Sequence, residues 1–378
     1  MSELGVLPRG ELLVAGGKVA AVGEKVEAPP GSEVIDAAGR VLMPGFVDCH
    51  THACFVASRL DDWTERLRGQ TETEIGAKGG GTPAIMRAVQ EATLKQLAAA
   101  LRERLARLLR DGTTTVEVKS GYGLTGEAEL KMLRAVVRAG KDWPGTVVPT
   151  ALIGHAHAGR ADEDTVTAAR GLLHEVSQEF PGIAVDVQAD EAAWTRETCV
   201  RLLEKAAKHH PLRVHADESK PLGLLPEAIR LHARSADHLE TSTKADLIAL
   251  GGSDVCGVIA PGVGFHTTGR YARGGFLIDQ GGAVALATHL SPDLCPIHSL
   301  PMAMALAARF CGLSAAEAIT AATVNAAAVL GLTDRGTLEA GQRADLLLLA
   351  HADERLLAYE PGGASIDRVF CAGRPVGA

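Results

Sequence analysis

Aromatic residues are scarce in this sequence, at 3 % of 378 positions, and its cysteines show no sign of pairing. The seven cysteines are scattered, odd in number and never spaced as Cys-x-x-Cys. A disulfide framework would show an even number of cysteines at short, regular spacings. The pattern therefore favours a reducing compartment, and we expect a cytoplasmic protein.

The chain also lacks an excess of positive charge, since 38 Lys and Arg residues face 46 Asp and Glu residues and the net charge is −8. Proteins that bind nucleic acid usually carry a basic patch, so we expect no nucleic-acid partner. No apolar run approaches the roughly 18 residues of a membrane span. The amino terminus lacks the charged start and hydrophobic core of a signal peptide. We therefore expect no membrane association.

The length is sufficient for one large α/β barrel and a small companion domain. Short apolar runs alternate with segments of helical spacing along the middle of the chain. The expected strands are the run that ends at His52 and the runs Thr113–Ser120, Thr146–Gly154, Val185–Gln188, Leu212–Ala216, Ser235–Leu239, Asp254–Ala260 and Ala283–Thr288. The expected helices are Ile85–Arg110, Glu127–Ala139, Asp164–Glu179, Glu197–Lys208 and Leu222–His232, followed after the eighth strand by Ile297–Cys311 and Ala315–Leu330.

Eight strands with helices between them predict a (β/α)8 barrel of the TIM type, because right-handed crossovers close such a series. A long flat sheet is the structural alternative. The two chain ends differ from the middle, since residues 10–42 and 336–378 carry short β runs separated by turn glycines. We expect residues 1–44 and 336–378 to form one small β-sandwich domain beside a barrel of residues 45–335.

Two histidines directly follow the first barrel strand. Side chains alternate between the faces of a strand, so His50 and His52 point the same way and can hold one cation. Cys49 lies between them and points to the opposite face, which favours a role in the core. Two histidines at a solvent edge are the plain structural alternative, because His-x-His is short and common.

Further histidines stand at the carboxyl ends of other expected strands. They are His155 after the third strand, His215 at the fifth, His238 at the sixth and His289 at the eighth. The interior of a barrel is normally filled with branched apolar residues, so packing does not explain five strands that end in histidine. The joint pattern favours a metal-dependent hydrolase. Glu117 and Lys119 in the second strand could form a structural ion pair or serve catalysis.

The chain resembles the imidazolonepropionases, a family of the amidohydrolase superfamily. The block Glu-Val-Lys-Ser-Gly-Tyr-Gly-Leu at 117–124 is a specific match, and 44–52, 215–218 and 235–238 support it. The resemblance covers nearly the whole chain, although the start is shorter than expected, so we expect a missing first sandwich strand or a misplaced start codon. It implies hydrolysis of 4-imidazolone-5-propanoate to N-formimino-L-glutamate in histidine degradation, with one bound zinc or iron.

The resemblance also implies roles for individual residues. His50, His52 and His215 match the metal ligands. Arg59, Tyr122 and His155 match substrate-binding positions, and the planar fork of Arg59 suits a propionate carboxylate. Glu218 matches the residue that contacts the imidazolone ring, and His238 the histidine that assists the attacking water. The substrate is then a small molecule, and a homodimer is a possible assembly.

A single metal is favoured because no lysine follows the fourth strand, at 185–190, to form a carboxylated bridge. The chain departs from the family at the chemistry itself. His289 stands where the family has an aspartate that binds metal and takes a proton from water. Ser291 and Asp293 replace an asparagine and a glycine that contact the ring, and Glu72 aligns with a tyrosine that helps to hold the propionate.

We therefore expect His289 to act as a fourth ligand and to belong to the catalytic group with His238 and Glu218. The loss of a carboxylate base leaves His238, Glu218 or Asp293 to move the proton. We assign Ser291 and Asp293 to the substrate site. Two alternatives stay open: an amidohydrolase for another cyclic amide or amine, and a non-catalytic relative that binds metal.

Overall fold

The computed structural model describes residues 1–155, 163–189 and 194–376, apart from the side chain of Glu72. Its centre is an eight-stranded parallel sheet in which each strand pairs with the next one along the chain. The strands are β4 (Phe46–Asp48), β5 (Thr113–Lys119), β6 (Thr146–Leu152), β7 (Ala184–Gln188), β8 (Leu212–Ala216), β9 (Ser235–His238), β10 (Cys256–Ile259) and β11 (Val284–Leu286). The bounds of β5 to β11 lie within two residues of the expected runs, whereas β4 ends at Asp48, before the expected end at His52.

The first and last strands of this sheet, β4 and β11, are joined just beyond their ends. The His289 N–H donates to the His50 carbonyl oxygen at 3.1 Å, and the His52 N–H donates to the Leu290 carbonyl oxygen at 2.9 Å. The Thr288 N–H donates to the Asp48 carboxyl at 3.1 Å. These bonds close the sheet, so the predicted (β/α)8 barrel is confirmed and the flat-sheet alternative is wrong.

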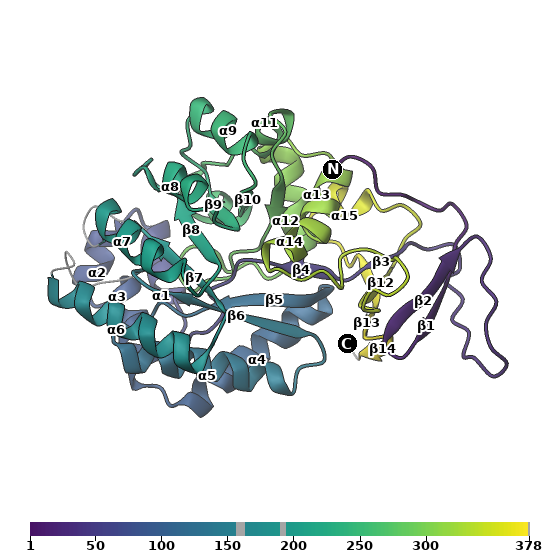
Figure 1. Cartoon of the computed structure of the whole chain (residues 1–378), viewed down its shortest axis with the longest axis horizontal. Helices are drawn as coiled ribbons and strands as arrows, with labels where there is room; N and C mark the ends of the chain where they lie inside the picture. Colours follow the sequence, from purple (N-terminus) through teal and green to yellow (C-terminus); the bar gives the residue numbers. More distant parts are fainter. Residues whose placement is uncertain (156–162, 190–193, 377–378) are drawn as a thin grey trace.

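Helices connect the strands and cover the outside of the barrel (Figure 1). Four of them begin at a threonine whose hydroxyl accepts an N–H of the first turn, at Thr93, Thr125, Thr195 and Thr243. Threonine is a favoured N-cap because it satisfies one of the unpaired helix donors. The connecting helices are α4 (Leu94–Arg110), α5 (Gly126–Lys141), α6 (Glu163–Glu179), α7 (Arg196–Ala206), α8 (Leu224–Arg230), α9 (Lys244–Gly251) and α11 (Gly274–Asp279).

The prediction of one helix over Ile85–Arg110 is wrong. Two helices, α3 (Gly81–Glu91) and α4, meet there at an extended Ala92. Thr93 accepts the Gln96 N–H at 3.2 Å, and the Gln96 side chain accepts the Thr93 N–H at 2.9 Å. This reciprocal capping box starts a new helix, so local polar bonds override the continuous helical spacing.

The other expected late helices are also divided. The stretch 297–311 becomes α12 (Leu300–Leu306) and a π-helical turn η2 (Ala307–Cys311), and 315–330 becomes α13 (Ala315–Ala321) and α14 (Val324–Val329). The other helical elements described are α1 (Leu60–Leu67), α2 (Glu72–Ala77), α10 (Pro261–Val263), the π-helical turn η1 (Gly264–Thr268) and α15 (Leu356–Tyr359). None of the helices described has the length and apolar character needed to cross a membrane.

The two chain ends lie together at one side of the barrel (Figure 1). They form an antiparallel pair, β1 (Glu11–Ala15) and β2 (Lys18–Gly23), and a four-stranded sheet of β14 (Arg374–Val376), β13 (Ile366–Cys371), β12 (Leu346–Leu349) and β3 (Leu42–Pro44). Val19 of β2 shares a buried cluster with Leu346, Leu348 and Phe370. The division into a sandwich of residues 1–44 and 336–378 and a barrel of residues 45–335 stays a prediction.

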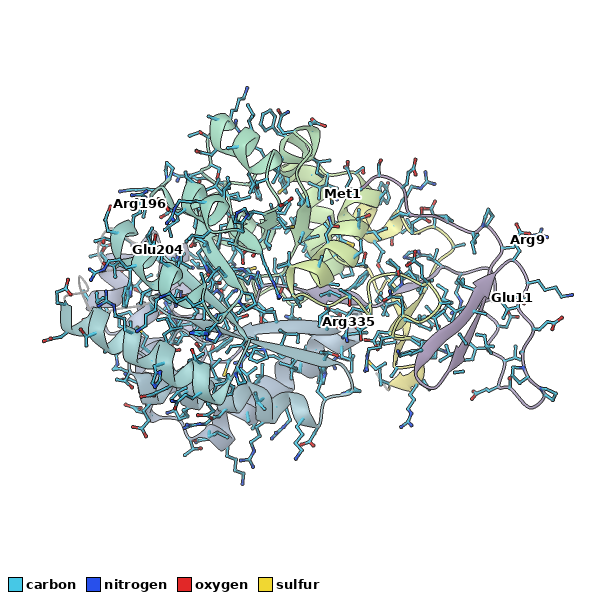
Figure 2. All side chains as sticks on the ribbon, in the orientation of Figure 1. Met1, Arg9, Glu11, Arg196, Glu204 and Arg335 are labelled. Atoms are coloured by element: carbon cyan, nitrogen blue, oxygen red, sulfur yellow. The ribbon has the colours of Figure 1, made fainter. Side chains whose placement is uncertain are left out.

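Arg335 joins the barrel to the terminal sheets (Figure 2). Its Nη1 donates to the hydroxyls of Thr115 and Thr146, at 2.8 and 2.7 Å, near the starts of β5 and β6. It also lies 3.8 Å from the Asp345 carboxylate, next to β12. The terminal sheets are therefore attached at the amino-terminal end of the barrel, which leaves the carboxyl ends of the strands available for a functional site.

Candidate active site

The histidines predicted from the strand ends come together in space. The side chains of His50, His52, His215, His238 and His289 are each at most 4 % exposed. Ring centroids lie 4.7 Å apart for His50 and His215, and 4.8 Å apart for His52 and His289. Cys49 is fully buried with Val47 on the other face of the strand, as its position between the two histidines predicts.

Three of these imidazoles direct nitrogen atoms into one space. The His52 Nε2 lies 3.3 Å from the Nε2 of His50 and 3.3 Å from the Nε2 of His215. A tetrahedral centre with metal–nitrogen bonds of about 2.0–2.1 Å holds its ligand atoms about 3.3–3.4 Å apart. The observed separations therefore match those of a metal ligand set.

The partners on the far side of two rings support the same conclusion. Asp237 lies 2.6 Å from the Nδ1 of His50, and Asp186 lies 3.1 Å from the Nδ1 of His215. A ring that gives its Nδ1 proton to a carboxylate keeps a bare Nε2 lone pair. A proton on His52 could satisfy only one of these two lone pairs, whereas a cation can bind all three nitrogens.

The imidazoles of His50, His52 and His289 are held in the neutral form that binds metal. Burial, reinforced by the charge of Lys119, lowers the pKa of His50 well below its ordinary value. Burial and the neighbouring His289 do the same to the pKa of His52. Burial also lowers the pKa of His289, followed by the effect of His238. Protonation therefore does not compete with a cation at neutral pH.

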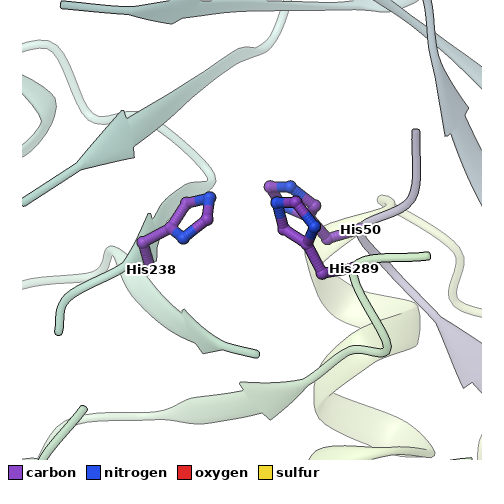
Figure 3. Close-up of side chains that lie close together, drawn as sticks. All are labelled: His50, His238 and His289. Atoms are coloured by element: carbon purple, nitrogen blue, oxygen red, sulfur yellow. The ribbon is translucent and has the colours of Figure 1, made fainter. Parts of the chain in front are cut away.

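A second triplet of possible ligands consists of His50, His238 and His289. Their ligand atoms lie within 4.8 Å of one another, as do those of the first triplet. Figure 3 shows the ring of His238 facing those of His50 and His289. His238 and His289 have φ angles of +88° and +62°, which non-glycine residues rarely adopt. Such strained backbone is typical of functional sites.

His238 differs from the other buried histidines because two carboxylates lie beside it. Its Nε2 is 3.9 Å from Glu218 and its Nδ1 is 3.5 Å from Glu240. Burial lowers its pKa, but the attraction of Glu218 and Glu240 outweighs that effect and raises the pKa to about 9. Gln188 donates to Glu218 at 2.8 Å and holds it in place. This arrangement suits a group that takes up and returns a proton.

The predicted substrate-binding residues lie at the same end of the barrel. The rings of Tyr122 and His155 are 5.3 Å apart, and the His155 ring is 5.3 Å from that of His52. One Nη of Arg59 contacts the Asp62 carboxylate, while its Nε and other Nη are buried without a hydrogen-bond partner among the residues that the structure describes. A buried guanidinium with two unused donors can bind a ligand anion.

The residues that depart from the family pattern have different surroundings. The Ser291 hydroxyl accepts the N–H groups of Leu294 and Cys295, at 3.2 and 3.0 Å, and so helps to hold its own loop. The Asp293 carboxylate accepts the Tyr122 hydroxyl at 3.3 Å. Burial, followed by this carboxylate, raises the pKa of Tyr122 well above its ordinary value. The side chain of Glu72 lies outside the described residues.

Sequence reasoning missed a buried ionic cluster directly beneath the histidines. Lys119 pairs with Glu117 at 2.7 Å, as anticipated for a structural ion pair, and also with Asp186 at 2.8 Å. Arg213 pairs with Asp237 at 2.6 Å and with Glu117 at 3.1 Å. The strand period could have revealed it, because Arg213 is two residues before His215 and therefore faces the same interior.

Comparison with known proteins agrees with this fold and site. The model of the Amidohydrolase family matches residues 41–376. A 5-methylcytosine deaminase structure from Klebsiella pneumoniae aligns with a TM-score of 0.75 and 18 % identity, covering 97 % of this chain and 94 % of its own. An atrazine chlorohydrolase from Arthrobacter aurescens, complexed with zinc, aligns with a TM-score of 0.70 and 16 % identity over 96 % and 89 %. The fold and the family match define a metal-dependent amidohydrolase.

Curated relatives narrow this class. The imidazolonepropionase of Deinococcus radiodurans is 44 % identical, with 99 % of this chain and 93 % of the relative aligned. The imidazolonepropionase of Rubrobacter xylanophilus is 40 % identical over 99 % and 92 %. The chain belongs to the imidazolonepropionase family.

Proposed function

We propose that this chain hydrolyses 4-imidazolone-5-propanoate to N-formimino-L-glutamate in histidine degradation. The observation that carries the proposal is the convergence of the Nε2 atoms of His50, His52 and His215, with two separations of 3.3 Å. Arg59 adds two unused buried donors at the same end of the barrel. A hydrolase for an anionic cyclic amide needs a centre that activates water and an anchor for the substrate carboxylate.

The cofactor in this proposal is one divalent ion, zinc or iron, held by His50, His52 and His215 with His289 as the fourth ligand. Imidazole nitrogen suits both metals. When bound, the ion supplies polarisation of the ring carbonyl and makes water more acidic. Because His289 is neutral where the family has a carboxylate, the four side-chain ligands bring no negative charge of their own.

His238 is the residue that we assign to proton transfer. In its neutral form it accepts a proton as water adds to the ring carbonyl carbon, and it returns a proton to the ring nitrogen when the carbon–nitrogen bond breaks. Glu218, 3.9 Å away, stabilises the charged form of His238, and we assign it to contact with the imidazolone ring. We assign His289 to the catalytic group because its ring lies 4.9 Å from the ring of His50 and 4.9 Å from the ring of His238.

The substrate is a small molecule whose propionate binds Arg59, with Tyr122 and His155 beside it. The Nδ1 of His155 contacts the Gly121 carbonyl oxygen at 3.2 Å, which holds the ring in place near Tyr122. Ser291 and Asp293 complete the site on the side of the loop after β11. Because Asp293 already accepts the Tyr122 hydroxyl, a substrate carboxylate must share that donor or displace the aspartate.

The test combines metal analysis with an absorbance assay on freshly made imidazolone propionate. Protein from medium supplemented with zinc and iron should carry about one ion per chain and consume the substrate. A His215→Asn variant, which loses one ligand, should lose both the metal and the turnover. Less than about 0.2 ion per chain in the unaltered protein would contradict the metal centre. Bound metal without turnover would contradict the substrate assignment.

A second candidate function is favoured by the Asp293 carboxylate beside Tyr122. An amidohydrolase for a cyclic amide or amine without a carboxylate at that position would avoid the repulsion. A panel of such substrates distinguishes the two functions. Absence of both metal and turnover would instead indicate a non-catalytic relative.

We further propose a cytoplasmic location, supported by seven unpaired, buried cysteines. We also propose a homodimer as the assembly.

A further inference from the structure

Five charged side chains form a cluster inside the barrel, directly beneath the proposed metal ligands. Their side chains are all 0 % exposed. Asp237 Oδ2 is a central atom of the cluster: it lies 2.6 Å from Arg213, 2.6 Å from His50 Nδ1 and 3.9 Å from Lys119. The members of this cluster, called the ionic cluster below, are Glu117, Lys119, Asp186, Arg213 and Asp237.

The ionic cluster reaches two of the four proposed ligands. Asp237 hydrogen-bonds His50, and Asp186 hydrogen-bonds His215. The Nδ1 atoms of His52 and His289 have no hydrogen-bond partner among the described residues. The carboxylates therefore fix the ring orientation and the tautomer of His50 and His215, while the other two rings receive no such bond.

The ionic cluster carries an uneven charge. Three carboxylates face the two cations Lys119 and Arg213, so the cluster holds one surplus negative charge in a dry interior. Burying an unpaired charge costs several kcal/mol in a protein. Arg213 is already held by Glu117, Asp237, the Ser235 hydroxyl and the Cys49 carbonyl. Four of its five N–H groups are used in these bonds, and the groups that face the cluster carboxylates from the other side are His50 and His215.

The proposed metal site above the ionic cluster has the opposite imbalance, an excess of positive charge. Neutral imidazoles from His50, His52, His215 and His289 would leave the two positive charges of a divalent cation unbalanced by any ligand. The carboxylate that the family places at the position of His289 is absent from this chain. One imidazole ring separates Asp237 from that cation position, and a hydrogen-bonded carboxylate makes an imidazole a more basic ligand.

We propose that Asp237 is a positioning residue that, acting through His50, supplies the negative charge missing from a four-histidine metal centre. Asp186 acts in the same way on His215, but more weakly, because it lies 3.1 Å from the His215 Nδ1, whereas Asp237 lies 2.6 Å from the His50 Nδ1. This inference rests on the proposed metal site. It goes further by assigning a function to residues that bind neither metal nor substrate.

A double-mutant cycle between Asp237→Asn and His289→Asp tests the proposal. The zinc affinity of the full chain is measured by competition with a chelator, and the visible spectrum of the cobalt-loaded protein reports the ligand geometry. Asp237→Asn keeps the shape of the side chain but removes its charge. It should weaken zinc binding by about 10- to 100-fold in the unaltered chain. In the His289→Asp background, where a ligand supplies the charge, the loss should be several-fold smaller and the cobalt spectrum should change less.

Asp345→Asn is the matched control. Asp345 is a buried aspartate, 4 % exposed, that pairs with Arg343 at 2.9 Å in the terminal sheet, far along the chain from the ligands. Its replacement should lower the thermal unfolding temperature without changing zinc affinity. If Asp237→Asn proves unfolded, Asp186→Asn enters the same cycle, with a smaller loss expected and the same dependence on His289→Asp.

Equal losses of zinc affinity in the two backgrounds would overturn the proposal, because the two carboxylates would then act independently. A zinc affinity unchanged by Asp237→Asn would overturn it as well. These results leave the proposed metal site intact. If the unaltered chain binds no zinc, iron or cobalt, the proposed function and the inference fail together. Thermal unfolding measured with and without bound metal provides a separate check. Asp237→Asn should lower the unfolding temperature of the metal-loaded protein more than that of the metal-free protein.

Discussion

Replacement of Arg59 by alanine should weaken the productive binding of imidazolone propionate far more than it weakens the fold. Within the described part of the chain the Arg59 Nε and one Nη are buried donors without a partner, and leaving such a donor unsatisfied costs about 1–3 kcal/mol. A substrate carboxylate would satisfy both. The remaining contact, with Asp62, lies near the surface at the start of α1, with side-chain exposures of 8 % and 15 %.

The size of the effect follows from these contacts. Loss of a charge-assisted, two-point contact with a carboxylate should cost on the order of 2–4 kcal/mol of transition-state binding. That corresponds to a fall in kcat/KM of about 30- to 700-fold. The unfolding free energy should change by only about 1 kcal/mol, because Asp62 keeps its bond from the Gly81 N–H at 3.0 Å and two unsatisfied donors disappear.

The assay compares kcat/KM for imidazolone propionate with that for an imidazolone that lacks the carboxylate. Arg59→Ala should affect only the first substrate, and Arg59→Lys should retain part of the activity, because it keeps the charge but loses the fork. Thermal unfolding of each variant separates binding from folding. An unchanged kcat/KM, or an equal loss for both substrates, would refute the assignment of Arg59 to the propionate.

Three further expectations concern the residues around the histidines. If the site is a weakened imidazolonepropionase, His289→Asp should raise turnover by about 10²–10⁴-fold, because it restores a base, and should tighten metal binding. The contrary result is an unaltered protein that turns over the substrate well and gains nothing from His289→Asp, even when Ser291→Asn and Asp293→Gly are added. That result would identify His289 as a working ligand. Asp293→Gly alone should lower KM for imidazolone propionate and leave kcat nearly unchanged, because it frees the Tyr122 hydroxyl. A raised KM would instead show that Asp293 helps to bind the substrate. Asp48→Asn should lower the unfolding free energy by about 1–3 kcal/mol in a denaturant titration, because it weakens the bonds to Thr288 that close the barrel. An unchanged unfolding free energy would mean that the backbone hydrogen bonds between the two strand ends are enough to close the barrel.

Local pattern in the sequence was enough to predict the barrel and the end at which its buried histidines gather. Apolar runs alternating with helical spacing give parallel strands, and histidines two residues apart in a strand face the same way whatever surrounds them. The helix break before Leu94 was also encoded locally, in Thr93 and Gln96, but continuous helical spacing concealed it. These features depend on neighbours close along the chain, so the sequence by itself determined them.

The tertiary structure alone decided which of these side chains meet. Asp237 and His50 are 187 residues apart, and Tyr122 and Asp293 are 171 apart, so no local spacing relates them. The pKa of His238 rises because Glu218 and Glu240 come within 4 Å of it in an interior where burial alone would lower it. Charge interactions in a dry interior depend on distance and exposure, and both are set only when the strands close into a barrel.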